Sequence, residues 1–309
     1  MKTADRRHQQ GSILIVVLIL MMVTVSLALY AVSLSRDCVA TSRQLLDNLQ
    51  CRLESGSVIE KIKYLGAIGR FGPSYLESVS VNKEFPLQMN IRGEPITVGN
   101  SEVRLIDSGG RCGLWPPNPE MVKRMVLAGG GSPEEGAVAA DSLLDWVDAD
   151  DLKHLNGAES FYYQSDHSLG YLPRNNPFIQ MVGELELIRG FRGKVFELVK
   201  GEIVETVSGK INYNTADPLM LAALLNIGAD RAASLVKLRN SRGFITEAEI
   251  LAQTGNNLTL VDEYITSVPS MTLAVDIRTR IGDAGDAVNA IISFKPGREK
   301  AFVVEKYSE

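Results

Sequence analysis

The residues best suited to chemistry are six oxygen-bearing side chains that crowd into fifteen positions. They are Asp145, Asp148, Asp150, Asp151, Asn156 and Glu159, in the segment SLLDWVDADDLKHLNGAES. Carboxylates this close repel one another unless a cation or a set of hydrogen-bond donors offsets their charge. Hard oxygen ligands favour Ca²⁺ over zinc. The cluster therefore predicts a calcium site, with a solvated acidic loop that caps a helix as the alternative.

The spacing of this cluster does not match an EF-hand. Counted from Asp148, the third position is Asp150 and the twelfth is Glu159, but Lys153 occupies the sixth position, where an EF-hand needs glycine. His154 and His167 lie nearby, so a periplasmic metal-dependent hydrolase is a second alternative. The His-Glu-x-x-His spacing of such hydrolases is absent from the sequence. We therefore expect a metal site without enzyme activity and without a small-molecule substrate.

A second candidate site is a pair of short helices joined by a tight turn. Thr215 or Asp217 is expected to cap an apolar helix, because both types accept hydrogen bonds from free backbone N–H groups. A turn with Ile227 and Gly228 leads to another helix over 232–238. This pattern resembles a helix–hairpin–helix unit of the SAM-like kind, whose glycine turn binds DNA phosphates in some proteins.

Charge argues against DNA binding by this helical pair. The basic residues of 209–255 are Lys210, Arg231, Lys237, Arg239 and Arg242, and the acidic ones are Asp217, Asp230, Glu247 and Glu249. Phosphate binding needs a clustered positive field, which this balance does not supply. The net charge of −5 offers no general attraction to nucleic acid either. We interpret the pair as a packing unit and keep a membrane-anchored DNA-binding protein as the alternative.

The elements that position these residues start with a long apolar stretch. Residues 12–35 contain no ionisable side chain except Tyr30, and a helix of this length crosses about 30 Å of hydrocarbon. Lys2, Arg6 and Arg7 precede it. The positive N-terminus predicts a single-pass protein of the cell inner membrane, with its N-terminus cytoplasmic and the rest periplasmic. The stretch exceeds the apolar region of a signal peptide, so we expect an anchor.

The helix is expected to continue over residues 36–70, outside the membrane. Its apolar positions have helical spacing and define one predicted face, formed by Leu46, Leu49, Leu53, Ile59, Ile62 and Leu65. The segment from Gly69 to Pro73 ends the helix. The sequence thus predicts one long rod, apolar first and amphipathic afterwards.

Strand patterns flank a middle region that lacks them. Apolar residues alternate with other residues at Phe85, Leu87, Met89 and Ile91, at Val103 and Leu105, and at Leu273, Val275 and Ile277. Helical patterns occupy 137–147, 185–198 and 219–225. We predict an α+β fold with the long helix packed on an antiparallel sheet. The sheet comes from residues 71–112 and 271–309, and 113–270 form a large inserted all-α domain.

The three cysteines do not predict a disulfide framework. Cys38 and Cys51 lie thirteen positions apart on one predicted helix, which separates them by about 20 Å along its axis. Cys112 has no evident partner in the sequence. We therefore predict no disulfide bond, although export would permit one.

Several segments, taken in order, resemble the K-type minor pseudopilins of type II secretion, the general secretion pathway protein K family. Gly11 separates a basic leader, residues 1–11, from the apolar stretch, as in prepilin signals. Val16 stands at the fifth mature position, where most pilin-like subunits carry glutamate and the K-type subunits do not. The other matching segments are Leu144–Asp148, Asn156–Glu159, Glu186–Phe191 and Lys210–Ala216.

The resemblance implies several further properties. A prepilin peptidase would cleave after Gly11, and Ser12 would be N-methylated. The fold would be a pilin-like domain with a helical insertion, and acidic loops would bind Ca²⁺. The chain would sit at the tip of a periplasmic pseudopilus with the I- and J-type minor pseudopilins. It would there support pseudopilus initiation and the export of folded proteins across the outer membrane.

Overall fold

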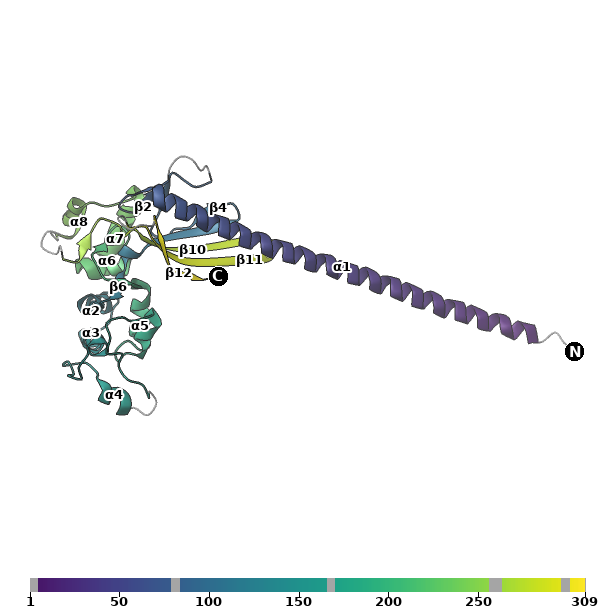
Figure 1. The fold of residues 1–309 in the computed structure, drawn as a ribbon, viewed down its shortest axis with the longest axis horizontal. Coiled ribbons are helices and arrows are strands. Elements are labelled where there is room, and N and C mark those ends of the chain that lie inside the picture. The colour runs from purple at the N-terminus through teal and green to yellow at the C-terminus, as the bar shows by residue number, and fades with distance from the viewer. Residues whose placement is uncertain (1–4, 79–83, 166–169, 256–262, 296–300, 309) are drawn as a thin grey trace.

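The structure is a computed structural model that describes residues 5–78, 84–165, 170–255, 263–295 and 301–308. One long helix dominates its shape, and the sheet and the inserted domain gather around the end of this helix that is far from the N-terminus (Figure 1). The C-terminus lies beside the sheet, next to β12. The mixed helix and sheet architecture confirms the predicted α+β class at this level.

Helix α1 runs without a break over Asp5–Ile68, for 64 residues. It contains a segment long and apolar enough to cross a membrane. The backbone is helical through Gly11 and Ser12, where the processing site is predicted. The helix ends at Gly69, whose N–H donates to the Leu65 carbonyl at 2.8 Å. A Cβ atom at Gly69 would lie 2.5 Å from that carbonyl oxygen and 2.7 Å from the Glu77 carbonyl oxygen, so the close approach requires glycine.

A five-stranded antiparallel sheet packs on the last part of α1. In spatial order its strands are β12 (Val303–Ser308), β11 (Ala284–Ser293), β10 (Thr272–Ile281), β5 (Ser101–Asp107) and β4 (Ile96–Val98). Strands β5 and β10 are direct neighbours, with Asp107 opposite Leu273, although the inserted domain separates them in sequence. Val103, Leu105 and the alternating apolar residues of β10 are buried, as their period-two pattern predicted.

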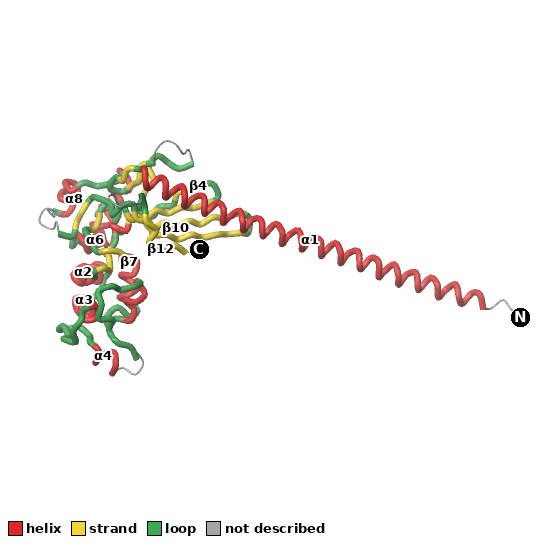
Figure 2. The backbone as a smooth tube through the Cα atoms, in the orientation of Figure 1, coloured by secondary structure: helices red, strands yellow, loops and turns green. Residues whose placement is uncertain are grey.

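The predicted apolar face of the helix is only half buried. Ile59, Ile62 and Leu65 are at most 2% exposed, whereas Leu46, Leu49 and Leu53 are 64%, 54% and 66% exposed. The prediction of one continuous buried face is therefore wrong for its first half. The sheet lies beside only the last part of α1 (Figure 2), and its β10–β11 turn reaches back as far as Asp47. Leu46 therefore precedes the sheet. Leu49 and Leu53 lie on the helix face turned away from it, since Cys51 between them in sequence is buried.

A second, smaller sheet follows α1 directly. It has the order β1 (Arg70–Phe71), β2 (Tyr75–Glu77) and β3 (Gln88–Asn90), all antiparallel. Phe85, Met89 and Ile91 are buried as predicted, but Leu87 is 66% exposed. Because the strand starts only at Gln88, Leu87 precedes the alternation and its predicted inward position is wrong.

The inserted region is mainly helical but not all-α, which corrects the prediction. Its helices are α2 (Pro119–Ala128), α3 (Pro133–Val147), α4 (Ser160–Ser165), α5 (Lys194–Val199), α6 (Pro218–Leu225), α7 (Ala229–Arg242) and α8 (Glu247–Thr254), with the 3₁₀ turns η1 (Ser108–Gly110), η2 (Val182–Leu187) and η3 (Lys200–Glu202). Two parallel strand pairs join them, β6 (Cys112–Trp115) with β7 (Ile203–Val207) and β8 (Ile211–Asn212) with β9 (Ile265–Thr266). These strands are too short to show alternation in sequence.

Two separate hydrophobic cores hold the molecule together. One joins α1 to the two antiparallel sheets, and the other lies within the inserted region between Cys112 and Ile265. Between them sits the carboxylate of Asp107, which is 1% exposed. It accepts hydrogen bonds from Gly109 and Ser270 on one oxygen, and from Asn212 and Thr215 on the other. A buried polar residue therefore ties the sheet to the insertion.

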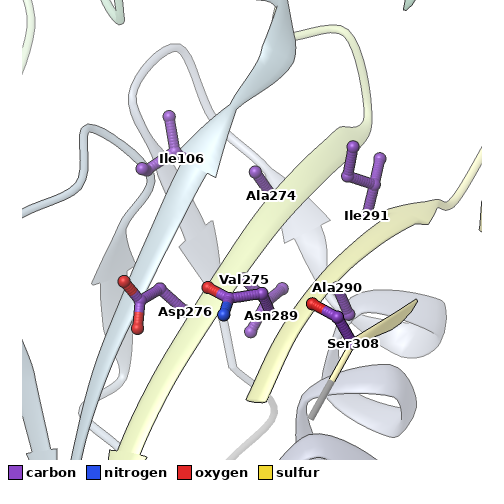
Figure 3. A pocket seen from close by; sticks show the side chains of 8 residues that line it. All are labelled: Ile106, Ala274, Val275, Asp276, Asn289, Ala290, Ile291 and Ser308. Atoms are coloured by element: carbon purple, nitrogen blue, oxygen red, sulfur yellow. The ribbon is translucent and has the colours of Figure 1, made fainter. Parts of the chain in front are cut away.

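The sheet face turned away from α1 carries a shallow hollow. Ile106, Ala274 and Ile291 line it from β5, β10 and β11, and Asp276 and Asn289 lie beside them (Figure 3). Its volume is about 260 Å³. This face is the one that the rod leaves open.

Candidate functional site

The acidic cluster is built at the C-terminal end of α3. Ser132 and Glu135 form a capping box at the start of this helix, and Pro133 occupies its first turn. The helix ends at Val147, and Asp148 is its C-cap residue. A helix C-terminus carries a partial negative charge, so the carboxylates of Asp145 and Asp148 are placed where the backbone disfavours them. Their position calls for a compensating positive charge.

Four of the six predicted ligands come together in the structure. Oxygen atoms of Asp148, Asp150 and Glu159 lie within 4.8 Å of one another. A second group, with the same limit, consists of one ligand atom each from Asp145, Asp148 and His154. Asp148 belongs to both groups, so the two are continuous. The first group has only oxygen donors, and hard cations such as Ca²⁺ prefer such a set.

Several oxygens of this cluster are buried without a hydrogen-bond partner among the described residues. They are Asp145 Oδ2, Asp148 Oδ1 and both carboxylate oxygens of Glu159. Asp145 is fully buried and Glu159 is 4% exposed. A buried charge without a partner is costly, because it loses its hydration and gains nothing in exchange. The residues therefore fit a cation, which would satisfy these oxygens together.

The pKa values of the cluster report the same repulsion. Burial, followed by the charges of Asp145 and Asp148, raises the pKa of Glu159 to about 7. Burial and the neighbouring carboxylates of Asp150 and Asp145 also raise the pKa of Asp148. Both shifts show that a negative charge is unfavourable here without a counter-ion.

His154 makes the one direct contact of a cationic side chain with the cluster among the described residues. Its Nδ1 is hydrogen-bonded to Asp145 Oδ1, and this bond raises the pKa of His154. Its backbone N–H also donates to the same oxygen at 3.1 Å. This contact offsets the charge of only one of the four carboxylates, that of Asp145. His167, the other histidine considered in the sequence, lies outside the described residues.

The remaining predicted ligands, Asp151 and Asn156, are hydrogen-bonded elsewhere. Asp151 accepts a bond from the Ser160 N–H at 3.2 Å. Asn156 donates through its backbone and side-chain nitrogens to Asp141 Oδ2 at 3.0 and 2.9 Å. Sequence reasoning did not select Asp141, although it lies four residues before Asp145 on the same helix face. That spacing was the signal that could have found it.

The loop that closes the cluster is held against the core of the insertion. Gly157 lies so close to α3 that a Cβ atom there would be 1.9 Å from Asp145 Oδ2. The Trp146 indole donates to Glu184 Oε1 at 2.9 Å, and Arg174 pairs with the same carboxylate. The ring of Trp146 meets that of Tyr163 edge to face, 5.3 Å between centroids. The acidic residues are therefore held in place by a tightly packed part of the insertion.

The second candidate site is a helical pair with a sharp bend. The chain bends by 117° between helices α6 and α7, across the turn that contains Ile227 and Gly228. Asp217 is the N-cap residue of α6 but makes no side-chain cap bond, and the Thr215 hydroxyl donates to Asp107 instead. Neither residue therefore caps the helix through its side chain, contrary to expectation.

One of the five basic residues counted in this pair is not at the surface. Arg239 is 4% exposed, and its guanidinium donates to the carbonyls of Tyr213 and Ala216 at 3.2 and 2.6 Å. Arg242 is paired with Glu249. Arg239 thus ties α7 to the segment before α6, which is a packing role and leaves the pair without excess positive charge.

The cysteines are free in the structure. Cys38 is exposed on α1, Cys51 is buried on the same helix, and Cys112 is buried in the core of the inserted region. Burial raises the pKa of the Cys112 thiol to about 12, so this group is neutral and unreactive at physiological pH.

Comparison with known proteins gives a consistent family signal. Residues 115–203 match the family model described as type II secretion system (T2SS), protein K. The type II secretion system protein K of Klebsiella pneumoniae is 32% identical over 147 residues, which are 44% of this chain and 44% of that protein. The protein of the same name from Pectobacterium carotovorum subsp. carotovorum is 28% identical over 181 residues, 54% of each chain. The chain thus spans about half the length of the curated relatives that it matches.

A solved structure shares the fold over most of the chain. It is a chain of the crystal structure of the GspK-GspI-GspJ complex from enterotoxigenic Escherichia coli, with a TM-score of 0.59 and 15% identity. The match covers 86% of this chain and 98% of that one. At this identity the likeness supports the fold.

Proposed function

Because this chain belongs to the family of type II secretion system protein K, we propose that it is a minor pseudopilin that caps the tip of a pseudopilus. In that position it supports the initiation of the pseudopilus and the export of folded proteins across the outer membrane. The observation that carries the proposal is the combination of one rod-like helix, a sheet packed on its far end, and a large domain inserted into that sheet.

The inserted domain suits a terminal subunit. It projects sideways from the end of the rod, at a steep angle to the axis of α1 (Figure 1). Subunits of a helical shaft stack closely along their rods, and a projection of this size would collide with the next subunit above. Such a domain is tolerated where the assembly is open on one side, which is the tip.

The apolar half of α1 supports the same place in the assembly. Val16 occupies the position at which most pilin-like subunits carry a buried glutamate, and its side chain is 55% exposed on the isolated chain. A carboxylate inside lipid requires a partner on a neighbouring subunit. A chain with valine there has no need of a preceding subunit, which is the situation of the first subunit in a stack.

Partner subunits would cover the exposed leucines of the rod. Leu45, Leu46, Leu49 and Leu53 are each more than half exposed on the helix after the predicted membrane span, where the sheet leaves one helix face uncovered. An apolar stripe of this kind on a soluble stretch of helix marks a contact surface. We assign it to the helices of the I- and J-type minor pseudopilins, which the related crystal structure contains in complex with GspK.

The membrane topology and processing belong to the same proposal. The first half of α1 anchors the chain in the lipid bilayer of the inner membrane, with the sheet and the insertion in the periplasm. The prepilin peptidase removes the leader after Gly11 and leaves Ser12 as an N-methylated first residue. No residue is assigned a catalytic role in this function.

The acidic cluster binds calcium in this proposal. Asp145, Asp148, Asp150 and Glu159 supply the oxygens, and the buried unpaired atoms of three of them are the supporting observation. The bound ion offsets their repulsion and holds the loop after α3 against the helix. Its role is structural, because it fixes the shape of the inserted domain that faces away from the rod.

The first test of the function is the mass of the mature N-terminus. The full-length chain is expressed with an active prepilin peptidase and extracted from membranes, and mass spectrometry of its N-terminal peptide should find methylated Ser12. The same chain from cells without the peptidase is the control and should retain its leader. Finding the leader intact in the presence of the active enzyme would contradict the proposal.

The second test addresses the tip position. The substitution Val16→Glu should leave the amount of I- and J-type subunits that copurify with this chain unchanged within about twofold, because a tip subunit has no preceding neighbour for a carboxylate to meet. The matched measurement uses the unsubstituted chain in the same detergent. Loss of the complex on restoring this glutamate would remove the main argument for the tip.

A further inference from the structure

A cavity lies at the junction of the sheet and the inserted domain. Its volume is about 240 Å³, and it is lined by residues from both sides of the junction. Ser108, Ser270 and Lys295 belong to the sheet side, next to the ends of β5, β10 and β11. Arg111, Ser208 and Lys210 come from the start and the end of the β6–β7 pair.

The charged residues that line this cavity have one sign. Arg111, Lys210 and Lys295 are cationic, and no aspartate or glutamate is among the lining residues. Arg111 makes no ion pair among the described residues, and its attraction to the buried carboxyl of Glu202 acts from farther away. Arg111 and Lys295, on opposite sides of one small volume, create a positive potential that attracts anions.

A buried hydroxyl is the second, independent observation. Ser108 is 5% exposed, and its Oγ has no hydrogen-bond partner among the described residues. Two neighbouring hydroxyls are already engaged, since Ser270 donates to Asp107 and Ser208 donates to the Gly113 carbonyl. A buried hydroxyl without a partner is costly. Ser108 lines the cavity, so a rotation of its covered hydroxyl toward the cavity would give it a partner in a ligand that accepts a hydrogen bond.

We propose that this junction cavity binds an oxyanion, such as a sulfate, phosphate or carboxylate group. Arg111 and Lys295 supply charge from opposite sides of the junction, and the Ser108 hydroxyl donates a hydrogen bond to one anion oxygen. The ligand bridges the sheet and the inserted domain, because its contacts come from both. Its binding therefore stiffens the angle between the rod and the insertion.

The ligand is a soluble anion or an acidic side chain, since the cavity lies far from the membrane. Phe294, the residue before Lys295, packs against α1 at Gly66. Gly66 lies 31 residues beyond the apolar stretch that ends at residue 35, which is roughly 45 Å along a helix. A lipid headgroup in the anchoring bilayer cannot reach that level.

The experiment is a titration of the full-length chain in neutral detergent, with sodium sulfate as the probe. Thermal unfolding is followed at pH 6, where Glu202, with a pKa of about 7, is mostly protonated. Sodium chloride of equal ionic strength provides the reference. Sulfate should raise the melting temperature with a saturable dependence, beyond the effect of chloride. A rise that stays linear in sulfate concentration, as general exclusion of sulfate from the protein surface produces, would overturn the proposal, and so would an identical response to both salts.

Three variants locate the site. Arg111→Gln and Lys295→Gln should each weaken sulfate binding about tenfold, the loss typical of one charge-assisted hydrogen bond. Lys237→Gln, at an exposed lysine on α7, is the matched control and should bind sulfate normally. Ser108→Ala should weaken binding without lowering the melting temperature of the sulfate-free protein, because the hydroxyl has no partner to lose. Equal binding in all variants would place the anion elsewhere.

A final comparison identifies the source of the oxyanion. Sodium phosphate and sodium acetate replace sulfate in the same titration. Tighter binding of sulfate and phosphate supports a free inorganic or ester anion, and equal binding of acetate supports an acidic side chain of a bound protein. Binding of none of the three would sink the proposal.

Discussion

At the scale of single residues, Asp107 shows how a polar group can define the relation between two domains. Its carboxylate accepts bonds from four residues of the junction, over 2.7 to 3.3 Å. Asn212 also donates to the Pro73 carbonyl at 2.8 Å, which extends the connection to the segment after α1. In sequence Asp107 is only the last residue of an alternating strand, and three of its four partners are more than 100 positions away. Local patterns could not predict this role.

The substitution Asp107→Asn should reduce the free energy of unfolding by about 2–4 kcal/mol. The new amide group must point its N–H bonds at donors, whichever way it turns, and so loses at least two hydrogen bonds. Urea unfolding of the full-length chain measures the effect. Asp276→Asn, at a partly exposed residue of β10 whose Arg278 partner is exposed, is the control and should change stability by less than about 1 kcal/mol. Equal effects of the two substitutions would contradict this account.

The raised pKa of Glu202 predicts that the stability of the chain depends on pH. Burial, and then the charge of Asp217, raises its pKa to about 7 in the folded chain. A carboxyl with a raised folded-state pKa binds its proton more tightly in the folded than in the unfolded chain, so stability falls as pH rises from about 4.5 through 7. Glu202→Gln should therefore exceed the unsubstituted chain by less than about 1 kcal/mol at pH 5 and by roughly 3 kcal/mol at pH 8.

The measurement for Glu202 is chemical unfolding at both pH values in excess calcium, which at the proposed calcium site would keep Glu159 from titrating. Glu186→Gln, at an exposed residue of the same domain, is the matched control and should show no such difference. A pH-independent gap between Glu202→Gln and the unsubstituted chain would show that the carboxyl is not the titrating group.

At the scale of elements, the acidic loop and the rod show what sequence patterns can and cannot predict. The residue types around Asp148 predicted which side chains would gather, because carboxylates this close in the sequence also lie close together in space. They did not predict that Asp151 and Asn156 turn away, since that depends on Ser160 and Asp141 in the folded loop. The helical spacing likewise predicted the rod but not how far along it the sheet would reach.

Calcium should reverse the effect that one substitution has on the stability of the chain. In chelator, Glu159→Gln should stabilise the chain or leave it unchanged, because it removes a buried charge from a repelling cluster. In excess calcium the same substitution should destabilise it, because a ligand is lost. Thermal unfolding in each condition measures both effects. Asp283→Asn, at an exposed acid on the β10–β11 turn, should respond to neither condition. A shift of the same sign in both conditions would exclude Glu159 as a ligand.

The exposed leucines of the rod should matter for assembly and not for folding. Leu49→Ser should change the free energy of unfolding by less than about 0.5 kcal/mol, since the side chain is 54% exposed. It should nevertheless reduce copurification of the I- and J-type subunits severalfold. Ile62→Ala is the contrasting variant on the same helix, where full burial predicts a loss of about 2–5 kcal/mol. Normal copurification with Leu49→Ser would remove this stripe from the interface.

At the scale of the whole molecule, periodicity predicted the class of fold well and the content of the insertion less well. The long helix and the strands of the outer segments have strong periods of 3.6 and 2. The short parallel pairs β6–β7 and β8–β9 have none, because two to five residues cannot display one. These pairs form when distant segments meet, as Cys112 meets Ile203. The domain boundaries proposed from the sequence stay a prediction.

The adjacency of β5 and β10 has a consequence for how such a chain can arise and be altered. Because Asp107 and Leu273 stand opposite each other, the two strands form an ordinary β-hairpin whose loop has grown into a domain. The entry and exit of that loop lie side by side, so we expect that a two-residue Asn-Gly turn could replace it and leave the hairpin closed. The insertion is in this sense a removable module. It could be exchanged between homologues without changing the pairing register of any strand.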